Sequence, residues 1–329
     1  MRLPRRLHDP SALLALAVAA ALAIGVVWGV QHFVGWATVA ATARLVPPGA
    51  WAGFAALLGL SYSARAVRLW RLLHDLDPRA RLARAAPVFF VHNALVTLLP
   101  ARLGEAALPL LARRWVGVDW AGAVGALAWW RLSDLAIVAA LALALLAAGA
   151  TVLAPLFALA LAACALPFVV FMLRASLVRL VAPGASGGGM RILAARMLSG
   201  MPGRLPALAA DLALGVTSWS TKLAAFALLI HAVLDAAGSS IPPAPLLAAA
   251  ALAGDTAGAL PMPTLGGIGP FEAGLVLGLG ALGIGATQAL AIGVLLHGAL
   301  LTSIVATGVV ALALGLWRER AREHARQNA

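Results

Sequence analysis

Long apolar runs alternate with short polar stretches along this chain, and most of those stretches carry arginine. An α-helix needs ~20 residues to cross the ~30 Å hydrocarbon core of a bilayer. Six runs have about this length or more, and they predict membrane spans at about 11–30, 49–66, 120–148, 151–173, 208–233 and 286–316. The apolar region of a cleaved signal peptide has ~7–15 residues, so the first run predicts an uncleaved span.

Two further apolar regions are interrupted by proline and glycine, and each carries a glutamate at its break. Residues 85–112 break at Pro100–Glu105, and residues 244–283 break at Pro261–Glu272. The pieces on either side are too short to cross a membrane, so each region predicts a helical hairpin that enters and leaves on one side. Interrupted segments at matching places in two halves are typical of transporters built on inverted repeats.

The pattern therefore predicts an all-α integral membrane protein. We expect about six full transmembrane helices and two opposed re-entrant helical hairpins related as inverted repeats; eight kinked transmembrane helices are the alternative. Residues 1–329 would form a single polytopic domain, with repeat halves at about 49–149 and 207–316 and a cytoplasmic loop at 174–206.

Composition and charge agree with a membrane protein. The chain is 63% hydrophobic and 11% charged, whereas soluble domains have roughly 25% charged residues. Its net charge of +12 comes from basic residues between the apolar runs, which is a signal of topology rather than of nucleic-acid binding. The positive-inside rule predicts a multi-pass protein with both termini in the cytoplasm. We expect it in a bacterial inner membrane. With Cys164 as the single cysteine, no intramolecular disulfide can form, and we predict no metal site and no cofactor.

The first break carries charge at membrane depth. Arg102 and Glu105 are three residues apart, so a helix that starts near Ala101 would place both on one face. Charged groups are costly in a bilayer and normally face a partner or a cavity. Arg102 is therefore a candidate phosphate ligand and Glu105 a candidate counter-charge or proton carrier, unless the pair only fastens the hairpin. Arg131 and Asp134 repeat this spacing, as an internal pair or with Arg131 as a second phosphate ligand.

The second break offers backbone amides. Gly266, Gly267 and Gly269 allow an unwound loop, and its amides with the helix that starts near Pro270 would form a nest for anionic oxygens. Glu272 lies in the first turn of that helix, where it complements the helix dipole or takes part in function. His297 lies near the position that matches Arg131 in the second half, as a packing residue or as a proton-sensitive group.

Three motifs give the chain a resemblance to a known family. They are Pro100-Ala101-Arg102-Leu103-Gly104-Glu105, then Arg131-Leu132-Ser133-Asp134, then the stretch from Pro263 through Gly266-Gly267-Ile268-Gly269 to Glu272. In this order they resemble the lysylphosphatidylglycerol synthase transmembrane-region family. The resemblance implies a function that involves lipids: either the flipping of aminoacylated phosphatidylglycerol or a role associated with hopanoid and polyprenyl-linked glycan pathways. Trp129-Trp130 stand where the family has an acidic residue, and His297 stands where it has a basic one.

We therefore expect a flippase-like translocase for a phosphate-bearing lipid. Because the sequence ends at Ala329, we expect it to lack the soluble aminoacyl-transferase domain and to be a transporter rather than an enzyme. Two alternatives stay open, a membrane-embedded lipid-modifying transferase and a non-catalytic partner of a lipid-biosynthesis enzyme. The expected partner is a membrane phospholipid or lipid-linked substrate and not nucleic acid; a homo-oligomer and a separate lipid-biosynthesis enzyme stay open as further partners.

Overall fold

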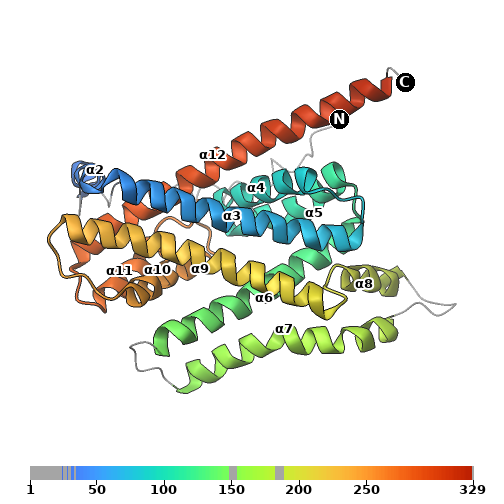
Figure 1. The fold of residues 1–329 in the computed structure, drawn as a ribbon, viewed down its shortest axis with the longest axis horizontal. Helices are drawn as coiled ribbons and strands as arrows, with labels where there is room; N and C mark the ends of the chain where they lie inside the picture. The colour runs from blue at the N-terminus through green and yellow to red at the C-terminus, as the bar shows by residue number, and fades with distance from the viewer. Residues whose placement is uncertain are drawn as a thin grey trace. The chain divides into compact units, whose positions relative to one another are not determined.

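The computed structural model describes residues 35–147, 154–181 and 189–327, together with Ile24, Trp28, Gln31 and His32. Within these residues the chain is helical and has no strand (Figure 1), which confirms the prediction of an all-α membrane protein. The predicted first span, residues 11–30, lies outside the described residues except for Ile24 and Trp28.

Long helices make up most of the described chain. Four of them are long and apolar enough to cross a membrane, and a fifth span results if α2 and α3, which meet at 93°, are counted as one. These five agree with the predicted spans that follow the first one. The long helices are α3 (Pro48–Leu76), α6 (Trp120–Ala147), α7 (Ala154–Val181), α9 (Leu205–Ala236) and α12 (Ala286–Gln327), and α2 is Trp36–Leu45.

Both interrupted regions are short helices on either side of a break, as predicted. The first consists of α4 (Leu82–Leu98), the 3-10 turn η2 (Pro100–Ala106), α5 (Ala107–Leu111) and the π-helical turn η3 (Ala112–Val116). The second consists of α10 (Ala244–Gly258), a loop, and α11 (Pro270–Gly280). The order of long helix, short helix, break, short helix and long helix thus occurs twice, from α3 to α6 and from α9 to α12. The relation of these halves by inverted symmetry stays a prediction.

The chain forms two compact units that are interleaved along the sequence. The hairpin unit comprises residues 1–55, 93–105 and 223–306, and the bundle unit comprises residues 56–92, 106–222 and 307–329. Each unit takes segments from both predicted repeat halves, because α3, α4, α9 and α12 each pass from one unit into the other.

Small residues bring α10 and α11 together in the hairpin unit. A Cβ atom added at Gly274 would lie 2.5 Å from the Ala253 carbonyl oxygen, and one at Gly278 would lie 2.7 Å from Ala250 Cα. Glycine at these positions lets the two backbones approach closely, which is how helices commonly pack in membranes.

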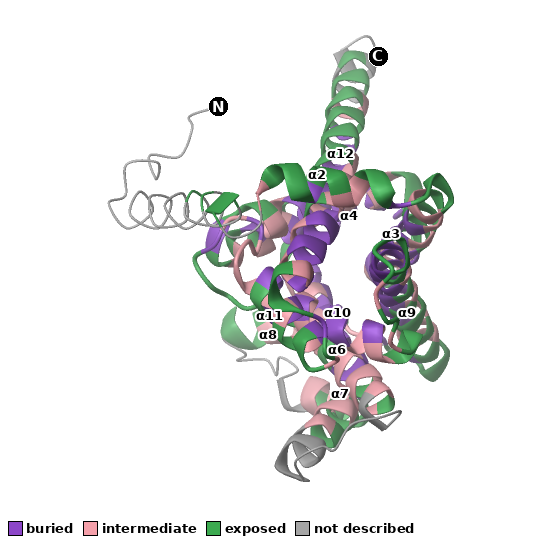
Figure 2. Cartoon of the chain, turned by 90° about the vertical axis from the view of Figure 1, so that its left-hand side faces the viewer, coloured by how far each residue is buried: buried purple, intermediate pink, exposed green. Residues whose placement is uncertain are grey.

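In the bundle unit, α6 packs against α5, α7 and α8 (Gly189–Ser199). Helix α8 lies within residues 174–206, for which the sequence predicts a cytoplasmic loop. Segments of α3 and α9 run antiparallel (Figure 1), since Ser61 contacts Ser218 while Arg68 contacts Asp211. Figure 2 shows almost no buried position on α7, and only 6% of its apolar span is buried. This helix therefore leaves a long apolar surface for lipid.

Candidate functional site

The first break is a strained turn. Ala101 and Arg102 have φ values of 50° and 57°, in the left-handed region that costs L-residues roughly 1–2 kcal/mol each. The prediction that a helix starts near Ala101 is therefore wrong, because the chain reverses through these two residues first. The predicted pair still forms, since Arg102 Nη2 lies 3.1 Å from Glu105 Oε1 and Arg102 Nε donates to the same oxygen at 3.2 Å.

Arg102 also joins the first break to the second within the hairpin unit. Its Nη1 donates to the Ala259 carbonyl at 2.7 Å, and the Ala101 amide donates to the Met262 carbonyl at 3.2 Å. Ala259 follows the last residue of α10, where helix carbonyls lack partners and the helix dipole favours a cation. The two motifs that sequence analysis singled out thus lie in direct contact.

The first motif needs a glycine at position 104, because the backbone of α4 leaves no room for a side chain there. A Cβ atom at this position would lie 2.2 Å from the Leu95 carbonyl carbon and 2.3 Å from the Val96 nitrogen. The turn is therefore pressed against the backbone at the end of α4, and any side chain at Gly104 would push the Arg102–Glu105 pair out of place.

The second break is closed by a buried glutamate and a buried histidine. Glu272 Oε2 accepts a hydrogen bond from the Gly269 amide at 2.7 Å, and Glu272 Oε1 lies 2.7 Å from His297 Nδ1. His297 Nε2 lies 2.9 Å from the Gly266 carbonyl oxygen. Phe271 stacks on the imidazole with ring centroids 4.2 Å apart. Gly266, Gly267 and Gly269 all have positive φ, as the predicted unwound loop requires.

The tautomer of the His297 ring decides which atom donates in each of these two contacts. Both ring nitrogens face oxygen atoms, but a neutral imidazole donates from only one of them. Both contacts can be hydrogen bonds at once if the ring is doubly protonated beside a carboxylate, or if the carboxyl group is protonated and donates to Nδ1. In both forms the pair holds one proton more than a neutral histidine and an ionised glutamate would hold.

The predicted amide nest is occupied in part by the protein itself. The Gly269 amide binds Glu272, and the Gly267 carbonyl accepts the Phe271 amide at 3.1 Å. Glu272 therefore complements the start of α11, because its carboxylate accepts a hydrogen bond from the N-cap amide of Gly269. The binding of substrate by Gly266, Gly267 and Gly269 stays a prediction.

The predicted site residues divide between the two units. Arg131 and Asp134 belong to the bundle unit, and the others, Arg102, Glu105, Gly266, Gly267, Gly269, Glu272 and His297, belong to the hairpin unit. The considered ion pair between Arg131 and Asp134 is not the one the structure forms. Asp134 binds Arg68 at 2.5 Å, whereas Arg131 Nη2 lies 3.3 Å from His92 Nε2.

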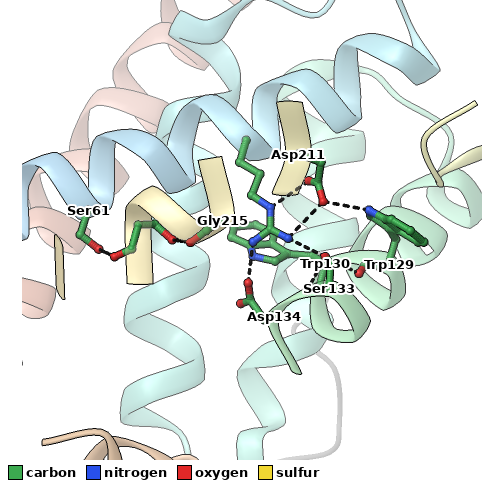
Figure 3. Close-up of polar contacts among 9 residues, drawn as sticks. Ser61, Trp129, Trp130, Ser133, Asp134, Asp211 and Gly215 are labelled. Atoms are coloured by element: carbon green, nitrogen blue, oxygen red, sulfur yellow. Dashed lines mark hydrogen bonds and ion pairs between the residues drawn. The ribbon is translucent and has the colours of Figure 1, made fainter. Parts of the chain in front are cut away.

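Arg68 is the centre of a buried polar cluster that sequence analysis missed. Its side chain is 0% exposed, and its Nε and Nη2 atoms donate to Asp211 Oδ1 and Oδ2 at 2.8 and 3.2 Å. Figure 3 shows Asp211, Trp129, Ser133 and Asp134 around this guanidinium. Trp129 Nε1 donates to Asp211 at 3.0 Å, and Ser133 Oγ accepts from Arg68 at 2.5 Å.

The cluster corrects one step of the topology prediction. Arg68 follows the predicted span 49–66 and so counts among the basic residues between the apolar runs, but it lies inside the protein between α3, α6 and α9. The available signal is a single acidic residue in each of two apolar stretches, Asp134 and Asp211, since such residues need a cationic partner. Gly215 makes room for the guanidinium, because a Cβ atom there would lie 3.0 Å from Arg68 Nη1.

This molecule is a multi-pass membrane protein, because several of its helices are long and apolar enough to cross a membrane. It holds a polar site in apolar surroundings, where charged groups lie at the helix breaks. Residues 13–325 match the family described as "Lysylphosphatidylglycerol synthase TM region", and the chain belongs to that family. The resemblance inferred from the three motifs is thereby confirmed, and the family supports a membrane role related to lipids. No curated protein and no solved structure matches the chain.

Proposed function

We propose that this protein is a translocase that moves a phosphate-bearing lipid between the leaflets of a bacterial inner membrane. The substrate class includes aminoacylated or anionic phospholipids and lipids of polyprenyl or hopanoid pathways. The observation that carries the proposal is the contact of the two helix breaks through Arg102 and Ala259. Transporters place their substrate sites at such breaks, where helix ends and charged side chains meet near the middle of the membrane.

Arg102 is the proposed phosphate ligand. Its side chain is 31% exposed and that of Glu105 is 27% exposed, so a headgroup can reach this pair. The left-handed turn that presents Arg102 supports the same role, because strained backbone is concentrated at functional sites. A phosphate that binds Arg102 would compete with Glu105 and with the Ala259 carbonyl for the guanidinium. Because the bond to Ala259 joins the two breaks, phosphate binding would weaken that contact.

Glu272 and His297 are the proposed proton-carrying pair. Their side chains are 8% and 4% exposed, so they act through the loop rather than by direct contact with a headgroup. Loss of the shared proton would leave His297 unable to donate to both Glu272 and Gly266. One of the two bonds that close the loop would then be lost, and the amides of Gly266, Gly267 and Gly269 would become available to anionic oxygens. Both termini are proposed to lie in the cytoplasm.

The role of Arg102 can be tested in proteoliposomes that contain the full-length chain. Flipping of fluorescent phosphatidylglycerol is measured as the fraction of label that becomes accessible to a membrane-impermeant reductant over time. We expect Arg102→Gln to slow flipping at least about tenfold, because hydrogen bonds to charged groups are worth roughly 1.5–3 kcal/mol. Arg71→Gln, which removes an exposed arginine from α3, is the matched control and should flip lipid at the wild-type rate. Equal rates in wild type and Arg102→Gln would exclude Arg102 as a substrate ligand.

A further inference from the structure

Arg65 has hydrogen-bond donors that the described structure leaves without acceptors. It lies one helical turn before Arg68 on α3, and its Nε and Nη2 atoms are enclosed and have no hydrogen-bond partner. Its guanidinium carbon lies 4.9 Å from the centroid of the Trp219 ring. The cation–π contact holds the group in place, but it does not satisfy the two N–H groups.

In the same unit, Arg68 shows what the Nε–Nη2 edge of a guanidinium binds. Arg68 also points Nε and Nη2 in one direction, and there they donate to the two carboxylate oxygens of Asp211. This edge is a planar fork that matches two oxygens of a carboxylate or a phosphate. Arg65 thus presents the same fork as Arg68 without the anion that Arg68 has.

Trp219 adds a third donor beside Arg65. Its indole Nε1 atom is also enclosed without a hydrogen-bond partner, and an indole N–H can only donate. Buried donors without acceptors are rare in folded proteins, because they have lost their hydration and gained nothing in return. Three such donors on two touching side chains need hydrogen-bond acceptors.

The surrounding charge favours an anion over a neutral acceptor. Lys222 Nζ lies 5.2 Å from the centroid of the same Trp219 ring, so two cations flank one indole. Asp134 is electrostatically coupled to Arg65, but its carboxylate binds Arg68. In apolar surroundings the Arg65 guanidinium, whose Nε and Nη2 donors have no acceptor, strongly attracts an anionic oxygen.

We propose that Arg65 and Trp219 form an anion-binding site in the bundle unit that takes a phosphate group. The phosphate comes from a lipid headgroup or is free phosphate, and both sources offer the oxygens that the three donors need. This site is separate from the Arg102 site in the hairpin unit. The proposal does not depend on the translocase, since binding here requires no transport.

Native mass spectrometry of the delipidated full-length chain tests this site. Wild type is titrated with phosphatidylglycerol and, separately, with diacylglycerol, which lacks the phosphate. We expect Arg65→Gln to weaken phosphatidylglycerol binding about tenfold and Trp219→Phe to weaken it about fivefold. Diacylglycerol binding should not change in either variant. Arg71→Gln is the control for loss of an exposed positive charge on the same helix.

Two further measurements complete the test. Arg65→Lys keeps the charge but not the fork, so we expect it to bind phosphatidylglycerol more weakly than wild type, while thermal unfolding verifies that each variant is folded. Competition by inorganic phosphate would identify free phosphate as a ligand of the site, whereas Arg65-dependent binding without competition would identify the lipid headgroup. Equal phosphatidylglycerol binding by folded wild type, Arg65→Gln and Trp219→Phe would overturn the proposal. Because flipping is not measured, this result would leave the translocase proposal unaffected.

Discussion

Single residues determine how the two helix breaks are held. Arg102 contacts Glu105 and the Ala259 carbonyl, and Gly104 brings this turn against the backbone at Leu95. The strain at Ala101 and Arg102 is tolerated because these contacts on both sides fix the turn.

Gly104→Ala should therefore destabilise the protein. The added methyl group would overlap backbone atoms of α4, which cannot move aside as a flexible side chain can. We expect a loss of about 3 kcal/mol, at the upper end of the usual cost of overpacking, seen as a lower Tm in detergent. Gly59→Ala is the matched control, because a Cβ atom at Gly59 on α3 has nothing within 4 Å. That substitution should leave Tm unchanged or raise it. An unchanged Tm in Gly104→Ala would show that the close approach to Leu95 is not a requirement.

At the scale of elements, one guanidinium connects three long helices. Arg68 on α3 binds Asp134 on α6 and Asp211 on α9, and all three side chains are buried. Burying such a group gains little net stability, but removing one partner leaves a charge poorly compensated. The cluster thus sets the register of α3 against α9 more than it adds to the overall stability.

Asp211→Asn tests this connection. It removes one of two carboxylates from a fully buried guanidinium, so we expect a loss of roughly 3–5 kcal/mol in unfolding free energy. The measurement is the Tm of each variant in detergent. Asp235→Asn changes an exposed position on the same helix, so the difference between the two variants isolates the effect of burial. If both variants unfold at the wild-type temperature, the cluster is not a structural connection.

The sequence predicts the helices and breaks better than it predicts the contacts of charged residues. Apolar length identifies the spans, and proline with glycine marks both breaks, because these are properties of the local chain. The left-handed turn at Ala101 and Arg102 depends on contacts with Ala259 and Met262, which are distant in sequence. The partners of Arg68 could not be assigned, since a flanking arginine and a buried one give the same local pattern. Pairing with Asp211 follows only from the antiparallel packing of α3 and α9.

At the scale of the whole molecule, the chain combines two kinds of charged structure in apolar helices. The hairpin unit holds two breaks in contact, with an accessible arginine at one and the buried Glu272–His297 pair at the other. In the bundle unit, Arg68 is paired with two carboxylates, and the nearby Arg65 has donors without acceptors. Together with membership of a lipid-related membrane family, these features support transport of a phosphate-bearing headgroup.

The most direct test is the rate at which the purified wild-type chain flips phosphatidylglycerol in proteoliposomes of defined composition. We expect a rate at least about tenfold above that of protein-free liposomes, since the uncatalysed crossing of a charged headgroup is opposed by the cost of placing charge in the bilayer core. The rate should also rise in proportion to the amount of protein per vesicle. A rate equal to that of protein-free liposomes, from chain that is folded by its thermal transition, would contradict the account.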